Sequence, residues 1–593
     1  MMREKIKALI QDVMEETFRS PNIAFSVVSA ENPTHGDYAS NIAFVCERVV
    51  AMQMNKHTGE VEGFYGLRTP QQFAEKMKQA LDAKTADFID RIVVAKPGFI
   101  NFFLSEAALA RGLADILADP DAWGKSDAGS GKTVMVDYFQ LNIAKRPHIG
   151  HIRSAIIGDA LKRLLASQGC TAVSDTHIGD WGTQFGILLL GYKEAGADLH
   201  TREIAEDPFG ALEEIYLAEN ARIKDDPDRR EQAKQEFARL EQGDAENRKI
   251  WQWMVEVSMK NLEESAARLG LLPFDEHRGE SFYEDKMAPI VEAALQKGIA
   301  KKTDDGAVIV DLTDEKLDEA VLVKSDGAST YLLRDLATIR YRKEHWDFWK
   351  NLYVVDVRQA HHFKQVFRVA ALLGFEGAGE SEHISYGFVK LPDGMLSTRQ
   401  GNVIALEKVL DEAEEKAAAA IREKNPGLKN AGEVARMVGL GALKYFDLSH
   451  HRSSDIVFRW DDALSFEGNS GPYLQYTHAR LKSILRKATA VFPPLVIPVE
   501  TGIQFDQTER RLTLVVMRFP EAISDALAIF SPHVLAGYLY DLAQVANEFY
   551  HSHPVMREQD NQKRNLRLAL VFAVSTTLKN GLNLLGIDAP EEM

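Results

Sequence analysis

The chain has 593 residues, of which 45% are hydrophobic and 26% are charged, as is typical of a globular protein and not of a disordered or fibrous one. Because a single core stops growing well below this length, we expect about two to four domains. The formal net charge of −17 argues against a protein that coats nucleic acid by charge alone.

Two further classes are disfavoured. No apolar run approaches the roughly 20 residues that span a membrane, and charged residues interrupt the N-terminal segment MMREKIKALIQDVMEETF, unlike the core of a signal peptide. We therefore expect a cytoplasmic protein with no membrane partner. The two cysteines, Cys46 and Cys170, are far apart in the sequence, which excludes a disulfide framework and a multi-cysteine zinc site.

The first predicted unit is a small α+β domain. It begins with an amphipathic helix and ends on the strand-like run GFINFFL, residues 98–104. The Gly- and Ser-rich stretch GKSDAGSGK, residues 124–132, is typical of a linker. We therefore place the first domain at 1–124.

The second predicted unit opens with a strand, a helix and another strand. TVMVDYF (133–139) suits a buried strand, Ile152–Ser167 has apolar residues at helical spacing, and TAVSDT (171–176) forms the next strand. This order predicts a parallel, doubly wound nucleotide-binding domain at 125–405. Further strands are expected at 306–312 and 351–357, and a polar helical insertion at about 200–265.

Nearly all of the chain after residue 405 has helical patterns, so we expect a helical stem and bundle at 406–593. Within this acidic chain, positive charge gathers at HARLKSILRKA (478–488) and KRNLR (563–567). Charge alone leaves two interpretations open, an RNA contact or a solvated helix face.

The loop after the first strand of the second unit carries two histidines at a helix N-terminus. Unpaired backbone N–H groups and the helix dipole favour an anion there, and His148 and His151 share one face. Gly150 leaves room for a flat group such as adenine. Glycine-rich dinucleotide and P-loop patterns are missing at this turn. We expect the histidines to hold phosphate, although an isolated pair would more often cap a helix without a ligand.

The motif HIGH at 148–151 is the signature of class I aminoacyl-tRNA synthetases, and its flanks narrow the resemblance. NIAKRPHIGHIRSAIIGDAL (142–161) and HIGDWGTQFG (177–186) resemble the arginyl-tRNA synthetase family. Other segments that resemble this family are HGDYASNIAF (35–44), KPGFINFFL (96–104), FDEHRGESFY (274–283), YLLRDLATIRYR (331–342), VVDVRQAHHF (354–363), LSFEGNSGPYLQYTHARLKSILRKA (464–488) and LLGIDAPEEM (584–593).

The resemblance implies an α/β fold with a Rossmann-like catalytic domain built on a parallel sheet, an α+β N-terminal domain that binds tRNA, and an all-α anticodon-binding bundle. It implies activation of L-arginine by ATP with Mg²⁺ and transfer of arginine to the 3′-terminal adenosine of tRNA(Arg). We also expect no protein-bound zinc, since the chain has only two cysteines, and a monomeric enzyme. Two alternatives remain open: a non-catalytic synthetase-like regulator that binds nucleotide or RNA, and a cysteinyl or methionyl class I synthetase.

The second class I motif, KMSKS, has a variant counterpart in GMLSTRQGN (394–402). Met395 and Arg399 stand where the family pattern has its two lysines, and Lys145 lies just before HIGH. We expect Lys145 and Arg399 to share the stabilisation of the phosphates. The resemblance implies a catalytic set of Lys145, His148, His151 and Arg399. It implies an ATP-binding set of His148, Gly150, His151, Met395, Ser397, Thr398 and Arg399.

Arginine recognition needs carboxylates with room for paired hydrogen bonds. Tyr331 and Asp335 would share one helix face, whereas residues alone would favour a surface salt bridge of Asp335 with a nearby arginine. The resemblance implies an arginine-binding set of Asp137, Asn142, His148, Tyr331, Asp335 and Gln359. The predicted tRNA contacts are Tyr473, Tyr476, His478, Arg480 and Lys482.

Overall fold

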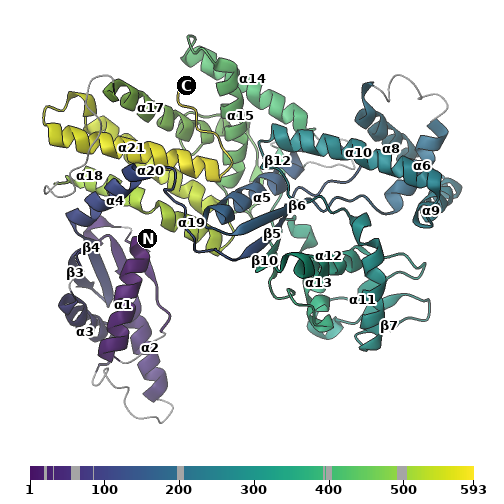
Figure 1. Cartoon of the computed structure of the whole chain (residues 1–593), viewed down its shortest axis with the longest axis horizontal. Helices are drawn as coiled ribbons and strands as arrows, with labels where there is room; N and C mark the ends of the chain where they lie inside the picture. Colours follow the sequence, from purple (N-terminus) through teal and green to yellow (C-terminus); the bar gives the residue numbers. More distant parts are fainter. Residues whose placement is uncertain are drawn as a thin grey trace.

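The computed structural model describes most of the chain (Figure 1). The described residues are 1–18, 23–30, 32–54, 67–84, 86–195, 206–391, 394–395, 404–489 and 504–593. In these ranges no helix is long and apolar enough to cross a membrane.

The N-terminal domain is an antiparallel sheet of order β1-β2-β4-β3 with helices packed on it. Its elements are α1 (Met2–Phe18), β1 (Val27–Ser29), β2 (Tyr38–Ser40), α2 (Ile42–Met54), α3 (Pro70–Ala83), β3 (Ile89–Ala95) and β4 (Phe99–Leu104). In α1 the buried residues Ile6, Ile10 and Val13 recur at helical spacing and pack against the sheet. The α+β prediction for this region is therefore confirmed.

The region predicted to be catalytic is built on a four-stranded parallel sheet of order β11-β10-β5-β6. The strands and their crossover helices are β5 (Thr133–Asp137), α5 (Ile149–Ser167), β6 (Thr171–Asp175), β10 (Lys350–Tyr353), α13 (Ala360–Leu373) and β11 (Ser381–His383). The chain winds outward from β5 in one direction and from β10 in the other. The crevice beyond the carboxyl ends of β5 and β10 is therefore the topological switch point, where ligands bind in this class of fold.

Two insertions separate β6 from β10. The first is helical and contains α6 (Thr183–Ala195), α8 (Pro208–Asp225), α9 (Pro227–Glu241) and α10 (Ala245–Arg268). The second contains α11 (Glu284–Gln296), β7 (Ala300–Lys302), β8 (Val308–Val310), β9 (Ala320–Val323) and α12 (Tyr331–Trp346). The strand predicted at 306–312 is present as β8, but it pairs with β7 and β9 in a separate antiparallel sheet.

The C-terminal region is helical, as predicted, apart from a short strand. Its elements are α14 (Leu406–Lys424), α15 (Ala431–Leu448), β14 (Ile456–Val457), α16 (Trp460–Ala463), α17 (Gly471–Thr489), α18 (Gln507–Met517), α19 (Phe519–Ala528), α20 (His533–Ser552) and α21 (Asn561–Leu584). A single hydrophobic cluster runs from Val134 in β5 through Leu161 in α5 to Leu578 in α21. Catalytic sheet and helical bundle are thus packed together.

A small sheet joins the catalytic sheet to the helical region. Its order is β13-β12-β14, with β12 (Val389–Leu391) antiparallel to β13 (Gly394–Met395) and parallel to β14. The predicted ATP loop, 394–402, begins in this hairpin. The chain thus leaves β11, forms β12 and β13, and returns as α14.

The N-terminal domain docks on the helical region through the HGDY segment and α4 (Glu106–Ala118) (Figure 1). The Asp37 carboxylate lies 2.6 Å from Arg510, and Tyr38 donates its hydroxyl to Glu521 at 3.0 Å. Arg518 donates to the Asp37 carbonyl at 2.9 Å. Two ends of the chain that are far apart in sequence therefore share a polar contact.

Candidate active site

The HIGH motif begins α5 at the switch point. His148 is the N-cap residue, and its Nδ1 accepts from the Gly150 N–H at 3.1 Å, while Nδ1 of His151 accepts from the His148 N–H at 3.1 Å. The two ring centroids are 3.8 Å apart. Because each Nδ1 is an acceptor, each neutral ring carries its proton on Nε2. The pair thus caps its own helix and keeps two Nε2–H donors.

Electrostatics keeps these rings neutral. Burial, followed by the charges of His148 and Lys145, lowers the pKa of His151 to about 3. Burial and then Arg358 lower the pKa of His148. Neutral imidazoles at neutral pH can donate hydrogen bonds to phosphate oxygens, but they do not supply positive charge. Positive charge at this site must therefore come from neighbouring side chains.

Two cations lie near the histidines. Lys145 is close enough to influence His151, and its Nζ lies 5.2 Å from the ring centre of Tyr216. Arg358 follows β10 and is held by Asp356 at 2.7 Å. Lys145 was predicted from its place before HIGH, whereas Arg358 was missed because only the turn after β10 brings it to His148.

The segment that follows the predicted ATP loop, Ile404 to Leu406, is hydrogen-bonded to the start of α5. The Ile149 N–H donates to the Ile404 carbonyl at 3.2 Å, and the Leu406 N–H donates to the Pro147 carbonyl at 2.9 Å. Met395 contributes to β13 with its backbone. The remaining predicted loop residues, Ser397, Thr398 and Arg399, lie outside the described residues.

Asp137 has a different neighbour from the one expected. It is fully buried at the end of β5, in register with Asp175 of β6, and both carboxylates lie 2.7 Å from Arg342. Burial raises the pKa of Asp137, and the adjacent Arg342 opposes that rise. Asp137 therefore has an internal guanidinium as its partner, and its predicted role in binding the substrate side chain stays a prediction.

Tyr331 and Asp335 lie one turn apart on α12, as predicted. Asp335 is 8% exposed and its Oδ2 lies 2.5 Å from Nε2 of His362, whereas Tyr331 is 64% exposed at the first position of the helix. Nε2 of His177 lies 4.0 Å from the other Asp335 oxygen. The simpler alternative, a surface salt bridge of Asp335 with an arginine, is wrong, since two histidines flank this buried carboxylate.

Glu280 is a carboxylate that sequence reasoning did not single out. It is 7% exposed and lies 2.8 Å from Arg334, which leaves Asp335 without that arginine. Burial raises the pKa of Glu280 to about 7, and the nearby charges of Asp335 and Asp180 add to the rise. The only signal was its position in the segment FDEHRGESFY. Asp335 and Glu280 are thus two buried carboxylates close to Tyr331.

Asn142 and Gln359 each follow one of the two central strands, β5 and β10. Asn142 is exposed just before HIGH and bridges to Gly179, where an added Cβ would meet Asn142 Oδ1 at 2.4 Å. Gln359 is exposed at the end of the 3-10 turn between β10 and α13. Both side chains are accessible beyond the carboxyl ends of the central strands.

The predicted tRNA residues on α17 differ in exposure. Tyr476 is 36% exposed, and Arg480 lies over its ring at 4.8 Å. Tyr473 accepts a hydrogen bond from Asn547, and Lys482 forms an ion pair of 2.8 Å with Glu591. These side chains are at least partly accessible.

His478 requires a correction. It is fully buried, its Nδ1 lies 3.0 Å from the Pro590 carbonyl, and burial lowers its pKa to about 4. Its ring therefore contacts the C-terminal segment and is not accessible to RNA.

Tyr550 on α20, which was not predicted, is 37% exposed and also lies beneath Arg480, at 5.3 Å. An aromatic and cationic surface thus forms across α17 and α20.

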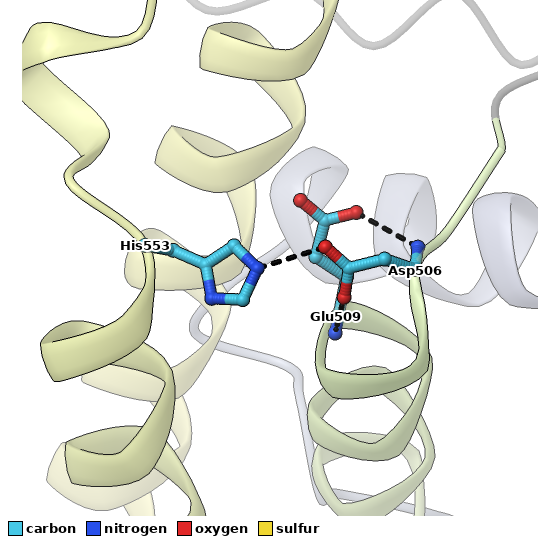
Figure 2. Close-up of side chains that lie close together, drawn as sticks. All are labelled: Asp506, Glu509 and His553. Atoms are coloured by element: carbon cyan, nitrogen blue, oxygen red, sulfur yellow. Dashed lines mark hydrogen bonds and ion pairs between the residues drawn. The ribbon is translucent and has the colours of Figure 1, made fainter.

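A group of possible metal ligands lies in the helical region (Figure 2). Atoms of Asp506, Glu509 and His553 come within 4.8 Å of one another. Asp506 caps α18 and lies 2.8 Å from His553, while Glu509 accepts from the Asp506 N–H and pairs with Arg567 at 2.9 Å. Helix capping and ion pairing account for these contacts.

The chain matches known proteins in all three regions. Residues 3–104 match the arginyl tRNA synthetase N-terminal domain, residues 113–460 match the catalytic domain described as tRNA synthetases class I (R), and residues 474–593 match the DALR anticodon binding domain. These three matches follow the N-terminal sheet, the parallel sheet with its insertions, and the helical bundle.

Individual proteins give the same result. The arginine–tRNA ligase of Fusobacterium nucleatum is 37% identical over 571 residues, covering 96% of this chain and 95% of the relative. That of Clostridioides difficile is 39% identical, covering 84% and 87%. The solved arginyl-tRNA synthetase of Thermus thermophilus superposes with a TM-score of 0.81 at 28% identity, with each chain covered in full. The chain therefore belongs to the arginyl-tRNA synthetase family of class I aminoacyl-tRNA synthetases.

Proposed function

We propose that this chain is an arginine–tRNA ligase: it activates L-arginine with ATP and transfers the arginyl group to the 3′-terminal adenosine of tRNA(Arg). The observation that carries the proposal is a pair of buried carboxylates, which we propose to form an acidic pocket, together with the two histidines at the start of α5. Asp335 and Glu280 are buried near the segments that follow β6 and β10, and His148 and His151 begin the helix that follows β5.

Arginine enters the pocket with its guanidinium towards Asp335 and Glu280, and with Tyr331 at the rim. A planar guanidinium forms charge-assisted hydrogen bonds with such carboxylates, and a neutral or differently shaped side chain leaves them unpaired. At the other end of the substrate, Asn142 and Gln359 hold the α-amino and carboxylate groups close to His148.

In the first step a carboxylate oxygen of arginine attacks the α-phosphorus of ATP. The bond to the β-phosphate bridging oxygen breaks, and pyrophosphate leaves with the Mg²⁺ that accompanied ATP. His148 and His151 donate Nε2–H to phosphate oxygens, and Lys145 and Arg399 supply positive charge as the leaving group departs. Gly150 gives adenine close access to the backbone, and Met395, Ser397 and Thr398 are proposed to contact ATP.

In the second step the ribose 2′-hydroxyl of the terminal adenosine attacks the carbonyl carbon of arginyl-adenylate. An ester forms, AMP leaves, and no covalent bond to the protein is needed. Tyr473, Tyr476, Arg480 and Lys482 are proposed to meet the anticodon region, where aromatic stacking on unpaired bases is effective. We further propose that the protein is a cytoplasmic monomer. One chain carries both the proposed amino-acid site and the proposed tRNA site, and the charged tRNA is used in cytoplasmic translation.

The deciding experiment is ATP–pyrophosphate exchange with the full chain, with and without tRNA(Arg). Exchange should depend on arginine and should not occur with lysine or citrulline at equal concentration. Exchange with cysteine or methionine would favour another class I specificity. No exchange under either condition would refute catalysis and favour the regulatory alternative, to which the variant residue Met395 points.

A further inference from the structure

Arg153 joins the HIGH helix to the stem of the helical region. It lies in the first turns of α5, is 1% exposed, and its Nε is 2.9 Å from Oδ2 of Asp447 in the last turn of α15. Its Nη1 donates to the Ser454 carbonyl at 2.8 Å, in the segment that follows α15. One buried guanidinium thus contacts two successive parts of the chain.

The segment contacted by Arg153 supports the hairpin that leads into the ATP loop. Immediately after Ser454, the Asp455 carboxylate accepts from the Phe388 N–H at 2.8 Å and pairs with Lys390 at 2.7 Å. The Ile456 N–H then donates to the Phe388 carbonyl at 2.9 Å as β14 aligns with β12. The outgoing side of the ATP loop is therefore held by the same segment that holds Arg153.

The buried ion pair of Arg153 and Asp447 is not explained by its contribution to stability alone. Nη2 of Arg153 and Oδ1 of Asp447 are buried with no hydrogen-bond partner among the described residues. Burial raises the pKa of Asp447, an effect that Arg153 only opposes. Apolar side chains of similar volume usually match or exceed the stability of such an incompletely paired ion pair. A role in positioning α5 explains the buried charges of Arg153 and Asp447 better than a role in stability does.

We propose that Arg153 is a positioning residue for arginine activation: it fixes the histidines of α5 relative to the β12–β13 hairpin, so that both motifs meet on the same phosphates. The return side of the loop is already tied to α5 by backbone hydrogen bonds at Ile149 and Leu406. Arg153 adds a second connection, because it contacts the segment at Ser454 that supports β12, where the chain enters the loop. This role rests on the proposed function, because it concerns the geometry of the activation step.

The test replaces the ion pair by apolar residues. In the double variant Arg153→Met/Asp447→Leu no unpaired charge remains, so the melting temperature should stay close to that of the parent. Misplaced reacting groups lose roughly 100-fold in rate per ångström, so kcat for pyrophosphate exchange with saturating tRNA should fall about 10- to 100-fold. KM for arginine should not change, because the pocket at Asp335 is formed by other elements.

A matched control uses the buried pair of Arg567 and Glu509, whose Nε–Oε1 distance is also 2.9 Å (Figure 2 shows Glu509). Arg567→Met/Glu509→Leu removes a buried pair from the helical region, together with the contacts of these residues with Asp506 and Glu558, and should leave kcat for exchange within about twofold of the parent. An equal loss of kcat in this control would overturn the proposal, because the loss would then follow from removing any buried pair.

The outcomes separate the positioning role from the proposed function. If the parent shows no exchange, the proposed function fails first. If the parent is active and the Arg153→Met/Asp447→Leu variant keeps full kcat, Arg153 is only structural and the inference is wrong. Should that variant not fold, Arg153→Lys decides: lysine can pair with Asp447 but cannot also hold Ser454, so a reduced kcat with unchanged arginine KM supports positioning, and full kcat overturns it.

Discussion

The substitution Glu280→Gln tests the electrostatics of the acidic pocket. Burial raises the pKa of this carboxyl group from 4.5 to about 7 even though Arg334 lies 2.8 Å away. The folded protein therefore binds this proton more tightly than the unfolded chain does. The resulting stability is fully present below pH 4.5 and is lost as the pH rises through 7.

The magnitude follows from the shift. A difference of about 2.5 pKa units corresponds to about 3 kcal/mol of unfolding free energy, at 1.36 kcal/mol per unit. Glutamine resembles the protonated acid and does not titrate. The stability of the variant relative to the parent should therefore increase by about 3 kcal/mol between pH 4.5 and pH 8.

Urea unfolding of both proteins without substrate, at several values across this pH range, measures the difference. A stability difference that stays constant with pH would refute the reasoning, because Glu280 would then titrate as an exposed glutamate does.

Substrate binding provides an independent check of the pKa of Glu280. A bound guanidinium favours the ionised carboxylate, so arginine binding near pH 7 should release more protons from the parent than from the variant. Calorimetry in buffers of different ionisation enthalpy detects this release.

Three further substitutions address individual side chains. Asp335→Asn removes a charge-assisted contact of about 1.5–3 kcal/mol, so KM for arginine should rise roughly 10- to 150-fold in steady-state exchange; an unchanged KM would exclude Asp335 from the pocket. Lys145→Ala should lower kcat for pyrophosphate exchange about 100-fold, and an unchanged rate would contradict its sharing of phosphate stabilisation with Arg399. His478→Ala should cost about 1–4 kcal/mol in thermal unfolding, because it removes a buried ring and its contact with Pro590, without changing the arginine KM. A weaker tRNA affinity at full stability would instead restore His478 as an RNA contact.

The central strands and the HIGH helix could be predicted because their signals are local. β5 is a short, β-branched, buried run, and α5 repeats apolar residues at helical spacing. The predicted phosphate-binding histidines do begin that helix. What the motif did not indicate is that each Nδ1 is engaged with the backbone, which decides the tautomer of each ring. This detail depends on side-chain rotamers, and sequence carries no information on them.

Asp137 and His478 lie in surroundings that the sequence did not indicate, for different reasons. Asp137 pairs with Arg342, a residue 205 positions away, through the strand register and the insertion of α12. No local pattern encodes that contact. His478 could have been placed correctly, because Leu474 and Leu481 stand four before and three after it and are buried on the same helix face. The adjacent basic residues favour an RNA contact, whereas the apolar periodicity indicates burial.

The docking of the N-terminal domain has a consequence for truncation. Glu521 is 3% exposed because the Tyr38 hydroxyl and the Arg3 N–H cover it, and Asp37 neutralises Arg510. A fragment that begins after Leu104 would expose this polar surface with its partners missing. The N-terminal domain thus completes the polar contacts of this face of the bundle, and the two regions depend on each other for them.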